Sequence, residues 1–180
     1  MMKYFKLVFV IILLSSVQNS FSQANMIYDW NKVVLDTTIQ EDILLGYCTA
    51  TGLRDSLIFK EYFEVAKQEY TPTIEAFTGL MDSLSKVEIT IIFGTWCSDS
   101  QREVPRVIML LDELGYPMNR LNIIAVNRQK LFPRVDLSNY NFEFVPTIIF
   151  YKKGIEIGRI IELPVETLET DISGFLLKNI

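Results

Sequence analysis

The chain has 180 residues, of which 49% are hydrophobic and 22% are charged, a composition typical of one folded domain. Its formal net charge of −5 disfavours a nucleic-acid partner, because proteins that bind nucleic acids carry clustered positive charge. Histidine is absent, which excludes Cys-His and Ser-His catalysis and most zinc sites. We therefore expect no metal and no cofactor.

The N-terminus has the pattern of a secretory signal peptide. Two lysines within residues 1–6 precede an unbroken apolar run, Leu7 to Leu14, and small and polar residues follow up to Ser22. This run is too short to cross a bilayer, which takes about 20 apolar residues. We predict a signal peptide over residues 1–22, export to the periplasm or the cell exterior, and no membrane span after cleavage. An uncleaved N-terminal anchor is the alternative.

The first half of the remaining chain is predicted to be mainly helical. Residues 23–42 show no clear period and are interpreted as an irregular lead-in, and residues 43–47 form a short apolar strand. Apolar residues then recur at helical spacing from 53 to 70, with Pro72 as a stop, and again up to 85. We therefore predict a helical segment over residues 53–85.

Strands and helices alternate in the second half. Residues 87–93 are rich in β-branched side chains, as a buried strand is, and a helix that begins at Cys97 or Ser98 runs to Gly115. Further strands are predicted at 121–126, 145–151 and 155–161, the last two joined as a hairpin by Lys152-Lys153-Gly154. The stretch 127–143 is a connection with one short helical turn, and a final helix starts at Pro164 with Val165 facing inward.

This order of elements predicts an α/β fold with a central mixed β-sheet flanked by helices. The sequence shows no internal repeat, no low-complexity region and no second domain. We therefore assign residues 43–180 to a single domain.

Three stretches of the sequence resemble the thioredoxin family. The strand "VEITIIF" runs into "GTWCSDS", where Trp96 and Cys97 match the family's Trp-Cys-x-x-Cys motif and Ser100 stands at the second cysteine. Pro105 occupies the place of a proline that kinks the following helix. The stretch "VPTIIFYKKG" is similar to the family's cis-proline, strand and Lys-Gly hairpin. Each match alone is weak, but their order is specific.

The resemblance implies a thioredoxin-like fold over residues 43–180, with a cis peptide before Pro146. Val145 and Pro146 would form one wall of a substrate groove, where the main chain pairs with a bound peptide. The competing interpretation is that Pro146 is an ordinary edge-strand proline. The family also buries an acid and often a lysine that help to deprotonate its second cysteine. Ile91 and Ala125 stand at those places here, so the second thiol and the groups that serve it are missing together.

Cys97 is the candidate reactive thiol. A helix N-terminus presents unpaired N–H groups that favour an anion, and the thiolate is the form that attacks a disulfide. Asp99 would oppose this, unless Arg102 holds its carboxylate away. Trp96 is interpreted either as a cover over the sulfur or as a core residue. The other alternative is that Cys97 is a packed apolar residue.

Two further residues have open interpretations. Ser100 either donates a hydrogen bond to the Cys97 thiolate or is an ordinary serine of the first helical turn. It cannot resolve a mixed disulfide, which takes a thiol. Cys48 is an inert packed thiol, a structural partner of Cys97 or a possible resolving thiol.

Our functional hypothesis is that of an exported oxidoreductase-like protein in cell redox homeostasis. Through Cys97 it would undergo single-thiol exchange with protein or small-molecule thiols and disulfides. The competing hypothesis is a redox-inert thioredoxin-fold module that binds peptides, and a purely structural envelope protein is a third. The sequence does not predict the oligomeric state.

Overall fold

The computed structural model describes residues 29–133 and 135–179. The predicted signal peptide, residues 1–22, and the first part of the lead-in lie outside them. None of the helices within these ranges is long and apolar enough to span a membrane.

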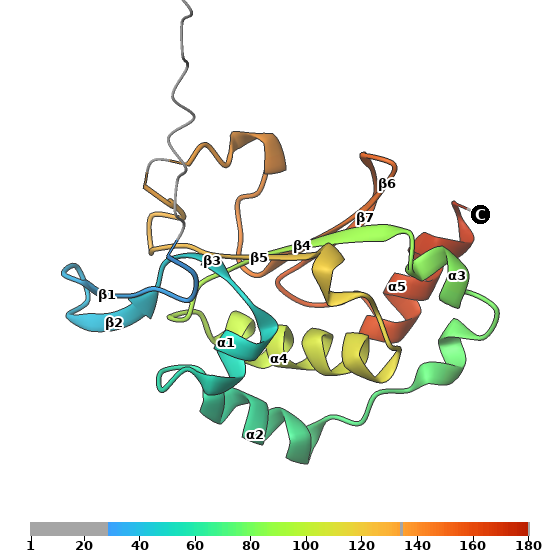
Figure 1. Cartoon of the computed structure of the whole chain (residues 1–180), viewed down its shortest axis with the longest axis horizontal. Helices are drawn as coiled ribbons and strands as arrows, with labels where there is room; N and C mark the ends of the chain where they lie inside the picture. Colours follow the sequence, from blue (N-terminus) through green and yellow to red (C-terminus); the bar gives the residue numbers. More distant parts are fainter. Residues whose placement is uncertain (1–28, 134, 180) are drawn as a thin grey trace, which may run out of the picture.

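A five-stranded mixed sheet forms the centre of the molecule, in the order β3-β5-β4-β6-β7 (Figure 1). β4 (Val87–Phe93) lies in the middle, because nearly all of its side chains are apolar and buried. It pairs in parallel with β5 (Leu121–Ala125) and antiparallel with β6 (Thr147–Lys152). β3 (Gly46–Cys48) and β7 (Ile155–Ile161) form the edges.

The helix α4 (Ser98–Glu113) connects the parallel strands β4 and β5. Its apolar face is buried on the sheet through Val104, Val107, Ile108, Leu110 and Leu111. Gly115 follows the helix with a φ of 61°, a left-handed conformation that glycine adopts without strain. A 3₁₀ turn, η2 (Met118–Arg120), then leads into β5. The predicted strand and helix boundaries in this region are confirmed to within two residues.

The predicted helical segment 53–85 is not continuous in the structure. It consists of α1 (Ala50–Asp55), α2 (Lys60–Glu69), the 3₁₀ helix η1 (Ile74–Phe77) and α3 (Met81–Leu84). The predicted helix from 53 to 70 breaks after α1, where Ser56 turns extended with a ψ of 127°. Leu57, which fits the helical period, is 83% exposed, so helical spacing alone was misleading there.

Part of the predicted irregular lead-in is a β-hairpin. β1 (Val33–Asp36) pairs antiparallel with β2 (Glu41–Leu44) as a separate two-stranded sheet. The Asp36 side chain fixes the turn by accepting hydrogen bonds from the Thr38 N–H and hydroxyl, at 2.9 and 2.6 Å. The predicted strand over 43–47 is divided between β2 and β3.

The C-terminal elements follow the prediction except at the last helix. β6 and β7 are joined through Lys153 and Gly154, whose φ values of 53° and 76° suit a tight hairpin turn. α5 (Leu168–Leu177) begins later than predicted, because the Thr167 side chain caps it by accepting from the Thr170 N–H. Val165, predicted to face inward, is 93% exposed.

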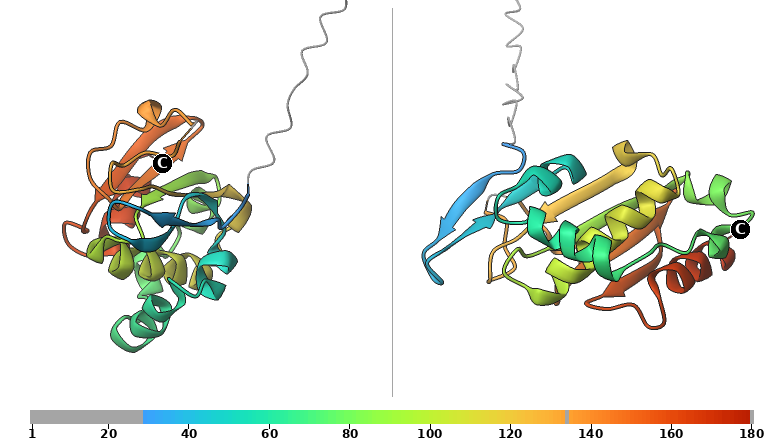
Figure 2. Two further views of the ribbon diagram at one scale, coloured as in Figure 1. Left: turned by 90° about the vertical axis from the view of Figure 1, so that its left-hand side faces the viewer. Right: turned by 90° about the horizontal axis from the view of Figure 1, so that it is seen from below.

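The two faces of the sheet are covered differently. α1, α2, α4 and α5 contribute to one large apolar cluster on one face, which includes Ile89, Ile91, Ile123 and Phe150. The opposite face carries a smaller cluster around Ile92, Ile124 and Ile149, covered by the segment 127–145. That segment contains the predicted short helical turn, as the 3₁₀ helix η3 (Ser138–Tyr140). Figure 2 shows this segment and the helices on opposite sides of the sheet.

Candidate thiol site at the start of α4

Cys97 lies at the N-terminus of α4, directly beyond the end of the central strand. It occupies the N-cap position with an extended backbone, and its side chain makes no capping hydrogen bond. A turn closed by the Cys97 N–H and the Gly94 carbonyl, at 3.0 Å, carries the chain from β4 to this position. The residue is partly exposed and its thiol is free. The sulfur is therefore placed where a helix N-terminus stabilises negative charge.

Val145 and Pro146 lie beside this sulfur. β4 and β6 are neighbours in the sheet with Ile92 opposite Thr147, so the chain after β4 meets the chain before β6. The Cys97 thiol lies 3.1 Å from the Val145 carbonyl oxygen, to which it donates. The Val145–Pro146 peptide is cis, as the family resemblance implied. Both side chains are buried, and the contact with the Cys97 sulfur is made by the Val145 main chain.

Trp96 is half-buried and packs over the turn that precedes it. Its indole Nε1 donates to the Val126 carbonyl at 3.0 Å, and the Arg128 guanidinium lies 5.4 Å from the ring centroid. A Cβ at Gly94 would come within 2.4 Å of the indole, so only glycine leaves room for the ring. Trp96 therefore has features of both interpretations. Its ring is anchored to the fold, as in a core residue, and it also lies next to Cys97 in the chain.

Ser100 is fully buried in the first turn of α4. Its hydroxyl accepts a hydrogen bond from the Gly94 N–H at 3.3 Å and so fixes the turn to the helix. Within the described part of the chain, Ser100 makes no hydrogen bond to the Cys97 sulfur, which instead donates to Val145. The geometry favours the structural interpretation of this serine over a role in binding the thiolate.

Cys48 is not brought to Cys97. It lies in β3 opposite Ile123, is 2% exposed, and packs in the large cluster on the helix-covered face. Cys97 contacts the smaller cluster of the other face, and β5 separates β3 from β4. The Cys48 thiol donates to the Gly46 carbonyl at 3.6 Å. This position favours the packed-thiol interpretation of Cys48 over a bridge or a resolving thiol.

We expect Cys48 to make folding stability fall at alkaline pH. Burial raises the pKa of its thiol to about 12, whereas an unfolded cysteine ionises near pH 8.5. Between these two pKa values the unfolded chain binds fewer protons than the folded chain, so the free energy of unfolding falls as the pH rises. The contribution of the Cys48 thiol is complete below about pH 8.5 and is lost as the pH rises toward 12. Urea unfolding at pH 8 and pH 10 measures it. Cys48→Ala should reduce the loss over this interval by about 2 kcal/mol, and an unchanged loss would contradict the assignment.

Several solved structures are similar to this chain at low sequence identity. No family model and no curated protein matches the chain. A Pseudomonas aeruginosa protein of unknown function is 14% identical over 67% of this chain and 80% of its own, with a TM-score of 0.41. Trxlp from Edwardsiella tarda is 22% identical over 58% of this chain and 95% of its own, with a TM-score of 0.37. Thioredoxin from Fasciola hepatica is 18% identical over 58% of this chain and 91% of its own, with a TM-score of 0.37.

The central mixed sheet with its flanking helices, the cysteine at the start of α4 and the cis Val145–Pro146 peptide together form the arrangement that the sequence predicted. The fold is thioredoxin-like. Within this thioredoxin-like fold, Ile91 and Ala125 are both fully buried in the apolar cluster beneath the site. The described part of the chain also contains no cluster of three or more acidic or thiol side chains suited to a metal ion.

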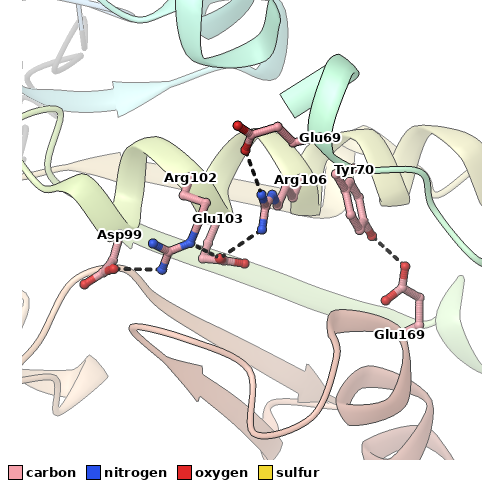
Figure 3. A network of polar contacts seen from close by, with 7 residues as sticks. All are labelled: Glu69, Tyr70, Asp99, Arg102, Glu103, Arg106 and Glu169. Carbon is pink, nitrogen blue, oxygen red and sulfur yellow. Dashed lines mark hydrogen bonds and ion pairs between the residues drawn. The ribbon is translucent and has the colours of Figure 1, made fainter. Parts of the chain in front are cut away.

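Only the Asp99–Arg102 pair of a larger charged network on the helices was predicted from the sequence. Glu103 in α4 is 3% exposed, and its carboxylate accepts a hydrogen bond from Arg102 Nε at 2.7 Å (Figure 3). The same carboxylate forms an ion pair with Arg106 Nη1 at 3.7 Å. Arg102 also binds Asp99 at 2.8 Å, as predicted, and Arg106 binds Glu69 of α2 at 3.3 Å. The signal that points to it is the run "REVPR", in which one acid has an arginine on either side within one helical turn.

The same region is linked to the C-terminal helix. The Tyr70 hydroxyl at the end of α2 donates to Glu169 of α5 at 2.7 Å (Figure 3). The same Glu169 oxygen accepts from the Thr73 N–H at 3.1 Å. Burial, followed by the hydrogen bond to Glu169, raises the pKa of Tyr70. These contacts join the end of α2 and the segment that follows it to α5.

Proposed function

We propose that the protein exchanges thiols and disulfides through Cys97 alone. The single observation that carries this proposal is the placement of a free, partly exposed thiol at the N-cap of α4, 3.1 Å from the Val145 carbonyl oxygen. A cysteine that only packs in the core needs neither a helix N-cap position nor partial exposure to solvent. The thioredoxin-like fold supports redox chemistry of this general kind, and the single-thiol character follows from Ser100 and Cys48.

In the proposed reaction, the Cys97 thiolate attacks one sulfur of a partner disulfide. A bond forms between Cys97 and that sulfur, the partner's own S–S bond breaks, and the second partner sulfur leaves as a thiolate. An external thiolate then attacks the mixed disulfide, takes the partner sulfur into a new disulfide, and returns Cys97 as a thiolate. Electrons therefore pass from the external thiol to the partner, with no net change at Cys97.

The start of α4 assists the first step. The unpaired N–H groups of the first helical turn favour an anionic sulfur. Asp99, the acid nearest in sequence, is bound to Arg102 at 2.8 Å, so its charge is compensated within the network of Figure 3. Cys97 therefore lies at the positive end of the α4 dipole, and the nearest acid is compensated. The hydrogen bond from its thiol to the Val145 carbonyl favours the protonated form and has to break when the thiolate forms.

The second step needs a thiol from outside. The Ser100 hydroxyl cannot attack a disulfide, and it is bound to the Gly94 N–H. The Cys48 thiol is buried, and the rise of its pKa to about 12 keeps it protonated at neutral pH. Disulfide isomerisation and single-thiol exchange fit this arrangement, whereas rapid dithiol reduction does not.

We also propose that the protein is exported and works on disulfides outside the cytoplasm. The support is the sequence of residues 1–22, together with the persistence of disulfides in oxidising compartments. The protein partners would be exported polypeptides with exchangeable disulfides.

Rearrangement of a scrambled multi-disulfide protein, in the presence of a small thiol, tests the proposal. The wild-type protein should accelerate rearrangement, Cys97→Ser should not, and Cys48→Ala should match the wild type. If Cys97→Ser keeps its effect while still binding the substrate, the protein is instead a redox-inert peptide-binding module.

A further inference from the structure

A pocket with a volume of about 300 Å³ lies beside the loop that carries Cys97. Residues from four parts of the chain line it: Glu41, Asp42 and Ile43 of β2, Ile58 and Tyr62 at and before α2, Thr95 and Trp96 of the loop, and Gln101 of α4. Its position depends on the β1–β2 hairpin, which lies at the same end of the molecule as the N-terminus of α4 (Figure 1). The exchange reaction described above makes no use of this pocket.

The rim of the pocket is negatively charged. Glu41 and Asp42 are exposed, and neither takes part in an ion pair with a described residue. Burial raises the pKa of Tyr62, and the carboxylates of Glu61 and Glu41 raise it further, which places a third acid near this wall. Two nearby cations have acidic partners. Arg128 lies over the Trp96 ring and interacts with Asp36 of the hairpin. Arg102 lines an adjoining hollow with Tyr62 and Gln101, and it is paired with Asp99 and Glu103.

The inner part of the pocket combines apolar surface with one unsatisfied polar group. Ile43 and Trp96 provide the apolar walls. Thr95 is 6% exposed, and its buried hydroxyl has no hydrogen-bond partner among the described residues. A buried polar group without a partner is destabilising, so a ligand that supplies a hydrogen bond here would be favoured.

The pocket is within reach of a molecule attached to Cys97. Thr95 and Trp96 directly precede Cys97, and consecutive Cα atoms are about 3.8 Å apart, so the Thr95 Cα lies within about 7.6 Å of the Cys97 Cα. An extended peptide advances about 3.3 Å per residue. A side chain one to three residues from a bound cysteine can therefore enter the pocket.

We propose that this pocket is a subsite for a lysine or arginine side chain of the polypeptide whose cysteine reacts with Cys97. The aliphatic part of such a side chain would pack on Ile43 and Trp96, and its charged end would meet Glu41 and Asp42. The inference rests on the proposed function and specifies its substrate class, namely proteins with a basic residue close to the exchanged disulfide.

The test uses short cysteine peptides that carry a neutral 2-thiopyridyl leaving group, whose release is followed by absorbance. Peptides with lysine, leucine or glutamate two residues from the cysteine are compared at low salt. The lysine peptide should react with Cys97 about fivefold faster than the leucine peptide, the gain expected from two exposed ion pairs, and the glutamate peptide should be slowest. The Glu41→Gln/Asp42→Asn double variant should remove this order.

A matched control neutralises two acids elsewhere. Asp82→Asn with Glu113→Gln changes the net charge equally, but both residues are exposed and lie outside the pocket. This control should keep the preference, and all variants should react equally with neutral dithiodipyridine. Equal rates for the three peptides, or a preference that survives in the double variant, would overturn the subsite. Failure of every peptide and of dithiodipyridine to react would instead refute the proposed function, and the subsite with it.

Discussion

Replacing Ser100 with cysteine is expected to shorten the lifetime of a mixed disulfide at Cys97 by at least about 10³-fold. Residue 100 lies in the same first turn of α4 as the N-cap sulfur. The introduced thiol would attack the Cys97 sulfur, release the partner as a thiol and leave an internal disulfide in the variant. An intramolecular attack of this kind has a far higher effective concentration than a millimolar external thiol.

The lifetime of the mixed disulfide is measured by mass spectrometry, which follows a preformed adduct over time without added thiol. Ser98→Cys is the matched control, because it adds a thiol at an exposed position of the same turn. Its adduct should persist about as long as that of the wild type. If the Ser100→Cys adduct is equally long-lived, the serine is not what limits the natural protein to single-thiol exchange.

Glu103→Gln should lower the free energy of unfolding by about 2–3 kcal/mol. The Glu103 carboxylate is 3% exposed and compensates both Arg102 and Arg106. Removing one member of a buried ion pair costs about 3–5 kcal/mol, and the partial exposure of both arginines reduces this value. Urea denaturation provides the measurement.

The control for this substitution lies on the same helix. Glu113 is exposed and takes part in none of the ion pairs among the described residues, so Glu113→Gln should change stability by less than about 0.5 kcal/mol. Equal stabilities of the two variants would show that the network contributes little.

The sequence predicted the part of the fold that carries the site. β4 is a run of seven residues with little polar character, and α4 has a clear apolar face and a terminal glycine, so both patterns are strong. Pro146 and the Lys153-Gly154 turn followed from the family resemblance and from turn chemistry. These local signals agree with the tertiary structure, and the predicted elements were therefore found.

The features that were missed depend on contacts that no local pattern encodes. β1 and β2 have four residues each, and only part of each strand is buried, so their alternation was too short to recognise. The break before α2 depends on Ser56, which has no special sequence context. Glu103 looks like a solvent-exposed helical acid until Arg102 and Arg106 are seen to enclose it. The pocket beside Trp96 depends in turn on the unpredicted hairpin.

The central claim is that one sulfur reacts and the other does not. Peptide mapping by mass spectrometry after brief exposure of the native protein to a neutral disulfide at pH 7 tests it most directly. We predict one mixed disulfide on Cys97 and an unmodified thiol at Cys48. A bond between Cys48 and Cys97, or an unmodified Cys97, would contradict the account.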